Sequence, residues 1–150
     1  ETCAKNVKII PRQIMYPLDT NILSELIQKH PSPSVLSQLS SKPAHTLFTS
    51  CICIMELRFG SVLRGDTEIF WEKVTQEIIS RVNIVPIAER EALSAGNILA
   101  DLRKKGESIG LEDVLIAASA LANQYIVVTA NIRHFIRIKG LKVENWLEAV

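Results

Sequence analysis

Apolar and polar positions along the chain alternate between two periods. Short, nearly continuous apolar runs bounded by turn residues are typical of buried strands. Such runs lie at 15–18, 46–49, 82–85, 124–129 and 141–143. Between them, apolar residues recur with the helical period, which is typical of amphipathic helices. The predicted helices cover 20–29, 34–41, 51–63, 67–80, 89–105 and 111–123, and a short one begins at Ile132.

The helix predicted at 111–123 is apolar almost all round, which indicates a central, buried helix. The segment 89–105 has instead one apolar stripe, which consists of Ala92, Ala95, Ile98, Leu99 and Leu102. Strands that alternate with helices favour an α/β fold, in which a parallel sheet lies between helices. In such folds, binding sites lie beyond the carboxyl ends of the strands.

The composition limits the class of protein. At 150 residues, of which 47% are apolar and 22% charged, the chain has the size and balance of a single globular domain. We expect that domain to span 15–150. Residues 1–14 show no period and no apolar signal-peptide core, so we expect a flexible N-terminal extension. The formal charge of +1 excludes a strongly basic protein, so any surface that binds nucleic acid has to be local.

The chain also carries signals of its cellular compartment. No apolar run approaches the roughly 18 residues of a membrane span, so no membrane segment is expected. Cys3, Cys51 and Cys53 are an odd set without a disulfide pattern, which favours a cytoplasmic protein. Because Cys51 and Cys53 stand two apart in a predicted helix, their side chains diverge, and we expect small, buried, apolar roles for both.

Three acidic residues, Asp19, Glu56 and Asp113, stand where folding alone would not place them. Each lies inside or against an apolar run, and a carboxylate is rarely buried unless it is paired or binds a metal. Asp19 follows the first predicted strand, and the helix starts that carry Glu56 and Asp113 reach the same edge of a parallel sheet. The three acids therefore converge in the predicted fold.

Each acid also has a purely structural explanation. Asp19 is a favoured helix N-cap, a distant arginine would satisfy Glu56, and the helix dipole stabilises Asp113. Glu112 lies about 100° round the helix from Asp113, so we expect it to be solvated or to stand outside the direct ligands. Jointly these explanations fit less well, because three converging carboxylates repel one another unless a cation holds them.

The ligand types narrow the choice of cation and of chemistry. Carboxylate oxygens suit Mg²⁺ or Mn²⁺ rather than zinc. His30, His45 and His134 lack the spacing of a zinc motif, and the chain has neither a glycine-rich phosphate loop nor a nucleophilic serine elbow. We therefore expect the three acids to hold Mg²⁺ or Mn²⁺. A cation bound in this way is a means of hydrolysing a phosphodiester.

Around these acids the chain resembles the PIN-domain endoribonucleases, specifically the VapC-type toxins of bacterial toxin–antitoxin pairs. The resemblance rests on four motifs in order: LDTNILS at 18–24, MELRFG at 55–60, EDVLIAA at 112–118 and VTANIRHF at 128–135. The segment GLKVENW at 140–146 also matches. Each motif alone is weak, but their order extends over nearly the whole chain.

The resemblance implies a three-layer α/β/α sandwich with a parallel sheet of four or five strands. It implies a divalent metal, Mg²⁺ or Mn²⁺, held by Asp19, Glu56 and Asp113, and endonucleolytic hydrolysis of RNA by the toxin of the pair. Transfer RNA is the substrate expected for the family. The partners implied are a VapB-like antitoxin, which inserts a segment near the site, and a second copy of the chain in a homodimer.

The fourth motif departs from the family pattern. Many relatives carry a further acid at the position of Asn131 or three residues later, at the position of His134, whereas neither residue is acidic here. Asn131 would still orient a water or a phosphate through its amide, so we include it among the catalytic residues. His134 is either a surface helix residue or a group that handles protons. This departure leaves open whether a second metal binds. It also leaves open whether the chain is a PIN-like domain that binds RNA or a partner without cleaving RNA.

Other side chains are candidates for contacts with RNA. The hydroxyls of Thr20 and Thr129 follow predicted strands, and Arg58 stands near Glu56. Local affinity would come from two basic clusters, 103–105 and the set of Arg133, Arg137 and Lys139. A receiver-like phosphoacceptor domain also gathers acids around Mg²⁺, but it fits poorly because no lysine follows the strand at 124–129.

Overall fold

The computed structural model of the chain describes residues 12–148. Most of the N-terminal extension predicted at 1–14 therefore lies outside the described residues. Of the remainder, Arg12 bonds to the side chain of Gln124, and Gln13 bonds to the ring of His45. These two residues are thus anchored on the body of the protein.

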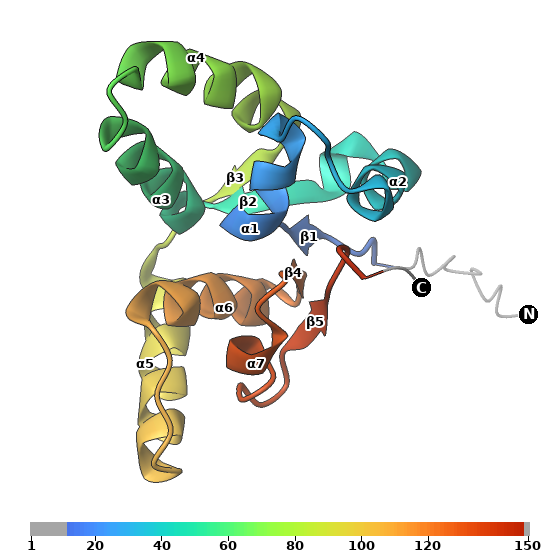
Figure 1. The fold of residues 1–150 in the computed structure, drawn as a ribbon. Helices are drawn as coiled ribbons and strands as arrows, with labels where there is room; N and C mark the ends of the chain where they lie inside the picture. Colours follow the sequence, from blue (N-terminus) through green and yellow to red (C-terminus); the bar gives the residue numbers. More distant parts are fainter. Residues whose placement is uncertain (1–11, 149–150) are drawn as a thin grey trace, which may run out of the picture.

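Five short parallel strands form the centre of the fold (Figure 1). Strands β1 (Tyr16–Pro17), β2 (Leu47–Ser50) and β3 (Asn83–Val85) form one sheet in the order β1-β2-β3. Strands β4 (Ile126–Val128) and β5 (Lys142–Glu144) form a second, parallel pair. The α/β class and the parallel pairing are as predicted.

Strands β1 and β4 join the two sheets. The backbone N–H of Asp19 donates to the carbonyl of Val128 at 2.8 Å, and that of Ile126 donates to Met15 at 3.1 Å. Leu18 and Val128 form an isolated parallel bridge between these bonds. The predicted sheet of four or five strands is therefore present as a three-stranded and a two-stranded part, with β1 beside β4 at the junction.

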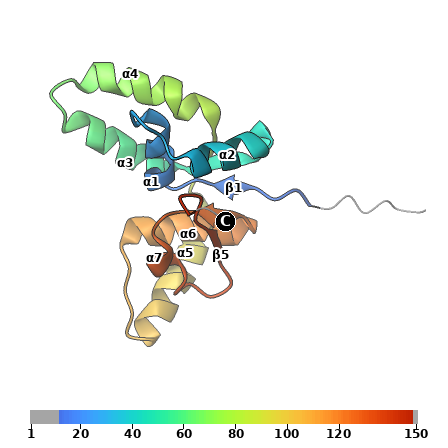
Figure 2. The same ribbon diagram turned by 45° about the vertical axis from the view of Figure 1, so that its right-hand side comes forward.

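Seven α-helices and three short 3₁₀ turns cover the strands of the described chain. The helices are α1 (Thr20–Leu23), α2 (Pro33–Ser41), α3 (Cys51–Val62), α4 (Thr67–Glu77), α5 (Glu89–Lys104), α6 (Leu111–Asn123) and α7 (Ile132–Phe135). The turns are η1 (Ser24–Ile27), η2 (Ala44–Thr46) and η3 (Ile79–Arg81). Figures 1 and 2 show α1 to α4 on one side of β1 and α5 to α7 on the other.

Two helices are shorter than the sequence predicted. Helix α1 ends at Leu23 and continues as η1, because the hydroxyl of Ser24 bonds to the Thr20 carbonyl at 2.8 Å and Gln28 is extended. Helix α4 ends at Glu77, and η3 takes the place of the last predicted turn. Tighter turns of this kind are frequent at helix ends.

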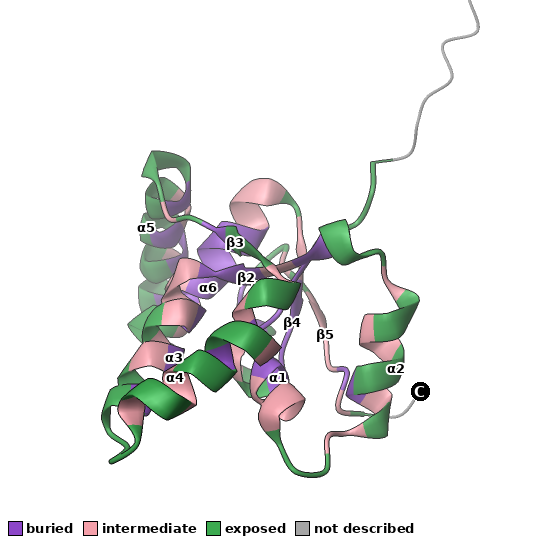
Figure 3. Ribbon diagram, turned by 90° about the horizontal axis from the view of Figure 1, so that it is seen from above, coloured by how far each residue is buried: buried purple, intermediate pink, exposed green. Residues whose placement is uncertain are grey.

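Helix α6 lies at the centre of the fold, as predicted, and its middle turns are buried (Figure 3). The predicted stripe of α5 is only partly correct. Leu99 is 42% exposed, whereas Glu91 is buried. Glu91 accepts from the Ala88 backbone N–H at 3.1 Å and from the Asn123 amide of α6 at 3.2 Å. A polar link between two helices thus sets the rotation of α5, which a count of apolar positions does not predict.

None of the helices within 12–148 has both the length and the apolar character required to cross a membrane. The thiols of Cys51 and Cys53 are free, and Cys53 is completely buried.

Candidate active site

Asp19 lies where β1 ends and α1 begins. It caps the helix, since its Oδ1 accepts from the Thr20 backbone N–H at 2.8 Å. Its Oδ2 accepts from the Thr129 hydroxyl at 2.8 Å and from the Asn21 amide at 3.3 Å. Only 5% of the residue is exposed, and this burial raises the pKa of the carboxyl despite the hydrogen bonds, with the charge of Asp113 adding to the effect. The capping explanation is therefore correct, but it leaves a desolvated carboxylate.

The end of β4 holds Asp19 in place. The buried Thr129 hydroxyl donates to Asp19 and accepts from the Asn131 backbone N–H at 2.9 Å. The side-chain oxygen of Asn21 accepts from the Ala130 backbone N–H at 3.0 Å. These bonds fix the carboxylate against the ends of two adjacent strands. Asn21 was not predicted to be a site residue, although it stands two positions after Asp19 in the first motif.

Glu56 lies on the second turn of α3, facing Asp19. Its Oε1 accepts from the Thr20 hydroxyl at 3.1 Å. Partial burial raises the pKa of this carboxyl, and the nearby charges of Asp19 and Asp113 raise it further. Arg58 lies toward α4, 3.6 Å from Glu68. The alternative that a distant arginine satisfies Glu56 is not met, because Glu56 has no ion pair among the described residues.

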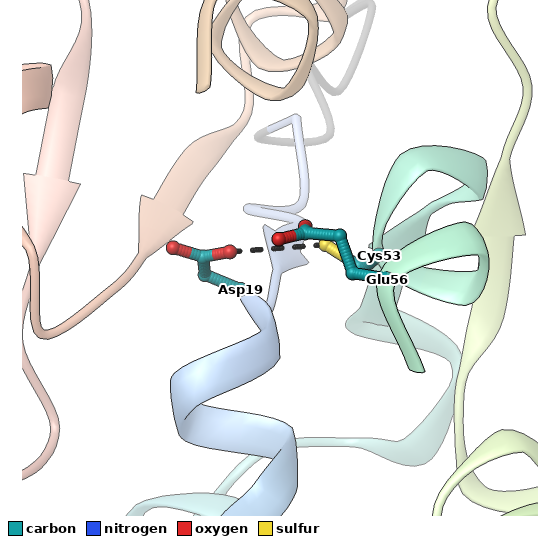
Figure 4. A group of neighbouring side chains, drawn as sticks. All are labelled: Asp19, Cys53 and Glu56. Atoms are coloured by element: carbon teal, nitrogen blue, oxygen red, sulfur yellow. Dashed lines mark hydrogen bonds between the residues drawn. The ribbon is translucent and has the colours of Figure 1, made fainter. Parts of the chain in front are cut away.

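Cys53, which was predicted to be a small buried apolar side chain, places a thiol beside Asp19. Its Sγ lies 3.8 Å from Oδ1 of Asp19, and ligand atoms of Asp19, Cys53 and Glu56 all lie within 4.8 Å of one another (Figure 4). Burial raises the pKa of the thiol to about 12, with the charge of Asp19 contributing, so it remains a protonated donor. The helical spacing of three between Cys53 and Glu56 was a signal that both share one face.

Asp113 lies on the first turn of α6, across the cleft from Glu56. Its Oδ2 is 2.6 Å from Nδ1 of His134 and 3.5 Å from the amide nitrogen of Asn131. The same amide nitrogen lies 2.8 Å from the His134 ring. His134 is a partly exposed residue of α7, as one interpretation had it, but its ring also contacts one of the three acids. Glu112 is exposed, as expected.

Glu56 and Asp113 border a cleft of about 600 Å³ between α3 and α6. The polar lining also includes Thr20, Glu112 and His134. Asp19 is buried outside this lining, with a carboxylate oxygen within 4.8 Å of one of Glu56. The apolar wall comes from α3, where Phe59 is 65% exposed. The structure thus places Asp19 and Glu56 in direct proximity and Asp113 at the same cleft, with Asn131 beside Asp113.

The donors at this cleft fit a hard divalent cation. Asp19 and Glu56 take part in no ion pair within the described part of the chain. Two desolvated carboxylates with a third nearby gain stability when a cation neutralises them. Oxygen ligands suit Mg²⁺ or Mn²⁺, and the protonated thiol of Cys53 is not a ligand for either.

The two basic clusters differ in how far their side chains are already bound to other groups of the protein. Lys105 pairs with Asp101 at 2.8 Å on the same helix, and Arg137 donates to the Ser108 carbonyl at 3.2 Å. Arg133 and Lys139 are exposed, and Arg133 stands on α7 beside His134. The second cluster is therefore the one that the fold brings nearer to the acids.

Residues 16–141 match the family model described as PIN domain. The chain belongs to the PIN-domain family. This PIN domain is 34% identical over 137 residues to a Haemophilus influenzae protein named ribonuclease VapC2. The alignment covers 89% of this chain and 99% of that protein. It is 32% identical over 117 residues to a Salmonella typhimurium protein named tRNA(fMet)-specific endonuclease VapC, covering 72% of this chain and 89% of that protein.

A solved structure supports the same assignment. The crystal structure of VapBC2 from Rickettsia felis, bound to a DNA fragment from its promoter, matches this PIN domain with a TM-score of 0.80 at 34% identity. The match covers 89% of this chain and 99% of that chain. The protein is therefore a VapC-type PIN domain, as its motifs predicted.

Proposed function

We propose that this PIN domain is the endoribonuclease toxin of a toxin–antitoxin pair and hydrolyses phosphodiester bonds of RNA at the cleft between α3 and α6. The observation that supports this most strongly is the convergence of Asp19, Glu56 and Asp113 on one cleft. Relatives that match most of the chain are named ribonucleases, and this agrees with the chemistry that such a cleft offers.

Asp19, Glu56 and Asp113 would hold the cation, Mg²⁺ or Mn²⁺. When bound, such a cation acidifies a water molecule and neutralises charge that develops on the phosphate. Thr129 and Thr20 hold the carboxylates of Asp19 and Glu56 through their hydroxyls. Asn131 contacts Asp113 and supplies an amide that orients a water or a phosphate oxygen.

We further propose partners for this PIN domain. Transfer RNA is the substrate class, in line with the name of the Salmonella relative. A VapB-like antitoxin is the protein partner, in line with the VapBC complexes among its structural neighbours. We also propose that the protein forms a homodimer and acts in the cytoplasm. The residues from 15 to 150 form its single domain, in which the helices on the two sides of β1 are the outer layers of a three-layer sandwich.

One observation favours a second candidate function. Asn131 and His134, neither of them acidic, stand beside Asp113 in the fourth motif. With no acid there, the chain would be a PIN-like domain that binds RNA or a partner without cleaving it. The presence or absence of cleavage in cells separates the two functions.

Sequencing of RNA 5′ ends after expression of the protein tests the proposed function. We expect new 5′ ends at one or a few sites in transfer RNA, and we expect none with Asp19→Asn. Glu72→Gln, which changes an exposed acid on α4, serves as the control and keeps the wild-type pattern. If wild-type expression halts growth without creating new 5′ ends, the binding-only function is the correct one.

A further inference from the structure

The corner of the cleft around Asp113 also carries a ring and an amide. The side chains of His134 and Asn131 both contact Asp113 there. His134 is half-exposed and borders the cleft, while 20% of the Asp113 side chain is exposed. The three groups form a closed cluster with separations of 2.6, 2.8 and 3.5 Å.

The contact between His134 and Asp113 fixes which atom carries a hydrogen. A carboxylate oxygen accepts, so Nδ1 of His134, at 2.6 Å from Oδ2, is the donor. Nδ1 therefore does not accept from the Asn131 amide nitrogen, which is a neighbour at 2.8 Å and not a hydrogen-bond partner. The neutral ring with its hydrogen on Nδ1 and the charged ring both make this bond. The contact therefore does not depend on the protonation state of His134.

Because of this bond, the two oxygens of Asp113 have different surroundings. Oδ2 is held by His134, whereas Oδ1 has no hydrogen-bond partner among the described residues. Groups that hold one atom of a metal ligand orient the other atom, and their loss commonly lowers metal affinity by about 10–100-fold. His134 thus holds Oδ2 of Asp113 and leaves Oδ1 available to a cation.

We infer that His134 is a positioning residue, which orients Asp113 for a divalent cation held at this cleft. The inference deepens the proposed function, because it concerns the same cleft, but it requires only cation binding and no cleavage of RNA.

Titration of the metal-free protein with Mn²⁺ tests the inference, with free Mn²⁺ counted by electron paramagnetic resonance. His134→Ala should bind Mn²⁺ about 10–100-fold more weakly than the wild type, since Asp113 loses its donor. His134→Gln keeps a donor without a titratable ring and should restore most of the affinity.

Each alternative result contradicts a defined part of the account. Unchanged affinity in His134→Ala, or a loss in His134→Gln as large as in His134→Ala, would overturn the positioning role and leave the proposed function standing. The melting temperature of each variant without metal, expected to match the wild type because His134 is half-exposed, shows that the fold is retained. Absence of any Mn²⁺ binding would contradict both the inference and the proposed metal site.

Discussion

Replacing Asp19 with asparagine is expected to lower the rate of RNA cleavage on the order of 10³-fold or more and to leave the fold intact. Asp19 is the most deeply buried of the three acids, and two strand ends hold its carboxylate. A bound cation lowers the barrier by several kcal/mol, and each ~1.4 kcal/mol corresponds to a tenfold change in rate. Asparagine removes the charge that holds the cation.

The fold should survive Asp19→Asn for two reasons. Asparagine is as good a helix cap as aspartate, so α1 keeps its first hydrogen bond from Thr20. The raised pKa of Asp19 shows that burial opposes its charge, so loss of the charge removes a desolvation cost along with the hydrogen bonds of a carboxylate.

Cleavage of a labelled RNA and thermal unfolding, both measured with and without Mg²⁺, test Asp19→Asn. Mg²⁺ should raise the melting temperature of the wild type, because it binds only the folded state, and it should not raise that of the variant. Glu72→Gln should behave as the wild type in both assays. Wild-type cleavage by a freshly purified Asp19→Asn protein would remove Asp19 from the site.

Replacing Glu56 with glutamine is expected to lower cleavage on the order of 10²-fold or more. Glutamine has the same shape and still accepts the hydrogen bond from Thr20, so the change isolates the charge. Glu56 is more exposed than Asp19, so we expect the smaller effect at this position. The measurement is kcat/KM as a function of Mg²⁺ concentration, with the half-saturating concentration raised in the variant.

A double variant shows whether Glu56 and Asp19 act on the same cation. Groups that work as one unit have non-additive effects. Asp19→Asn combined with Glu56→Gln should therefore be little worse than Asp19→Asn alone. Multiplication of the two single losses would mean that Glu56 acts through something other than the shared cation.

The alternation of apolar runs and helical stripes predicted the α/β class, because it follows directly from which side chains are buried. The positions of Asp19, Glu56 and Asp113 could also be predicted, since an acid in an apolar run is costly without a partner. The end of α1 and the rotation of α5 could not. They depend on the hydroxyl of Ser24 and on the bonds of Glu91, which compete with regular packing.

The contacts around the acids could not be predicted from the sequence, because they join residues that are far apart along the chain. Thr129 is 110 positions from Asp19, and His134 is 21 positions from Asp113. Helical period shows which residues share a face, but not what that face meets across a cleft. The role of His134 therefore emerged only when α6 and α7 were placed together.

Cleavage by one metal-free preparation tests the central claim most directly, namely that the acids of this cleft hydrolyse RNA with a divalent cation. The protein is stripped with EDTA, transferred to metal-free buffer and mixed with transfer RNA before and after addition of Mg²⁺ or Mn²⁺. We predict no cleavage before the addition and rapid internal cleavage after it, with none at either stage for Asp19→Asn. Equal cleavage with and without the cation, or equal cleavage by Asp19→Asn after the addition, would contradict the account.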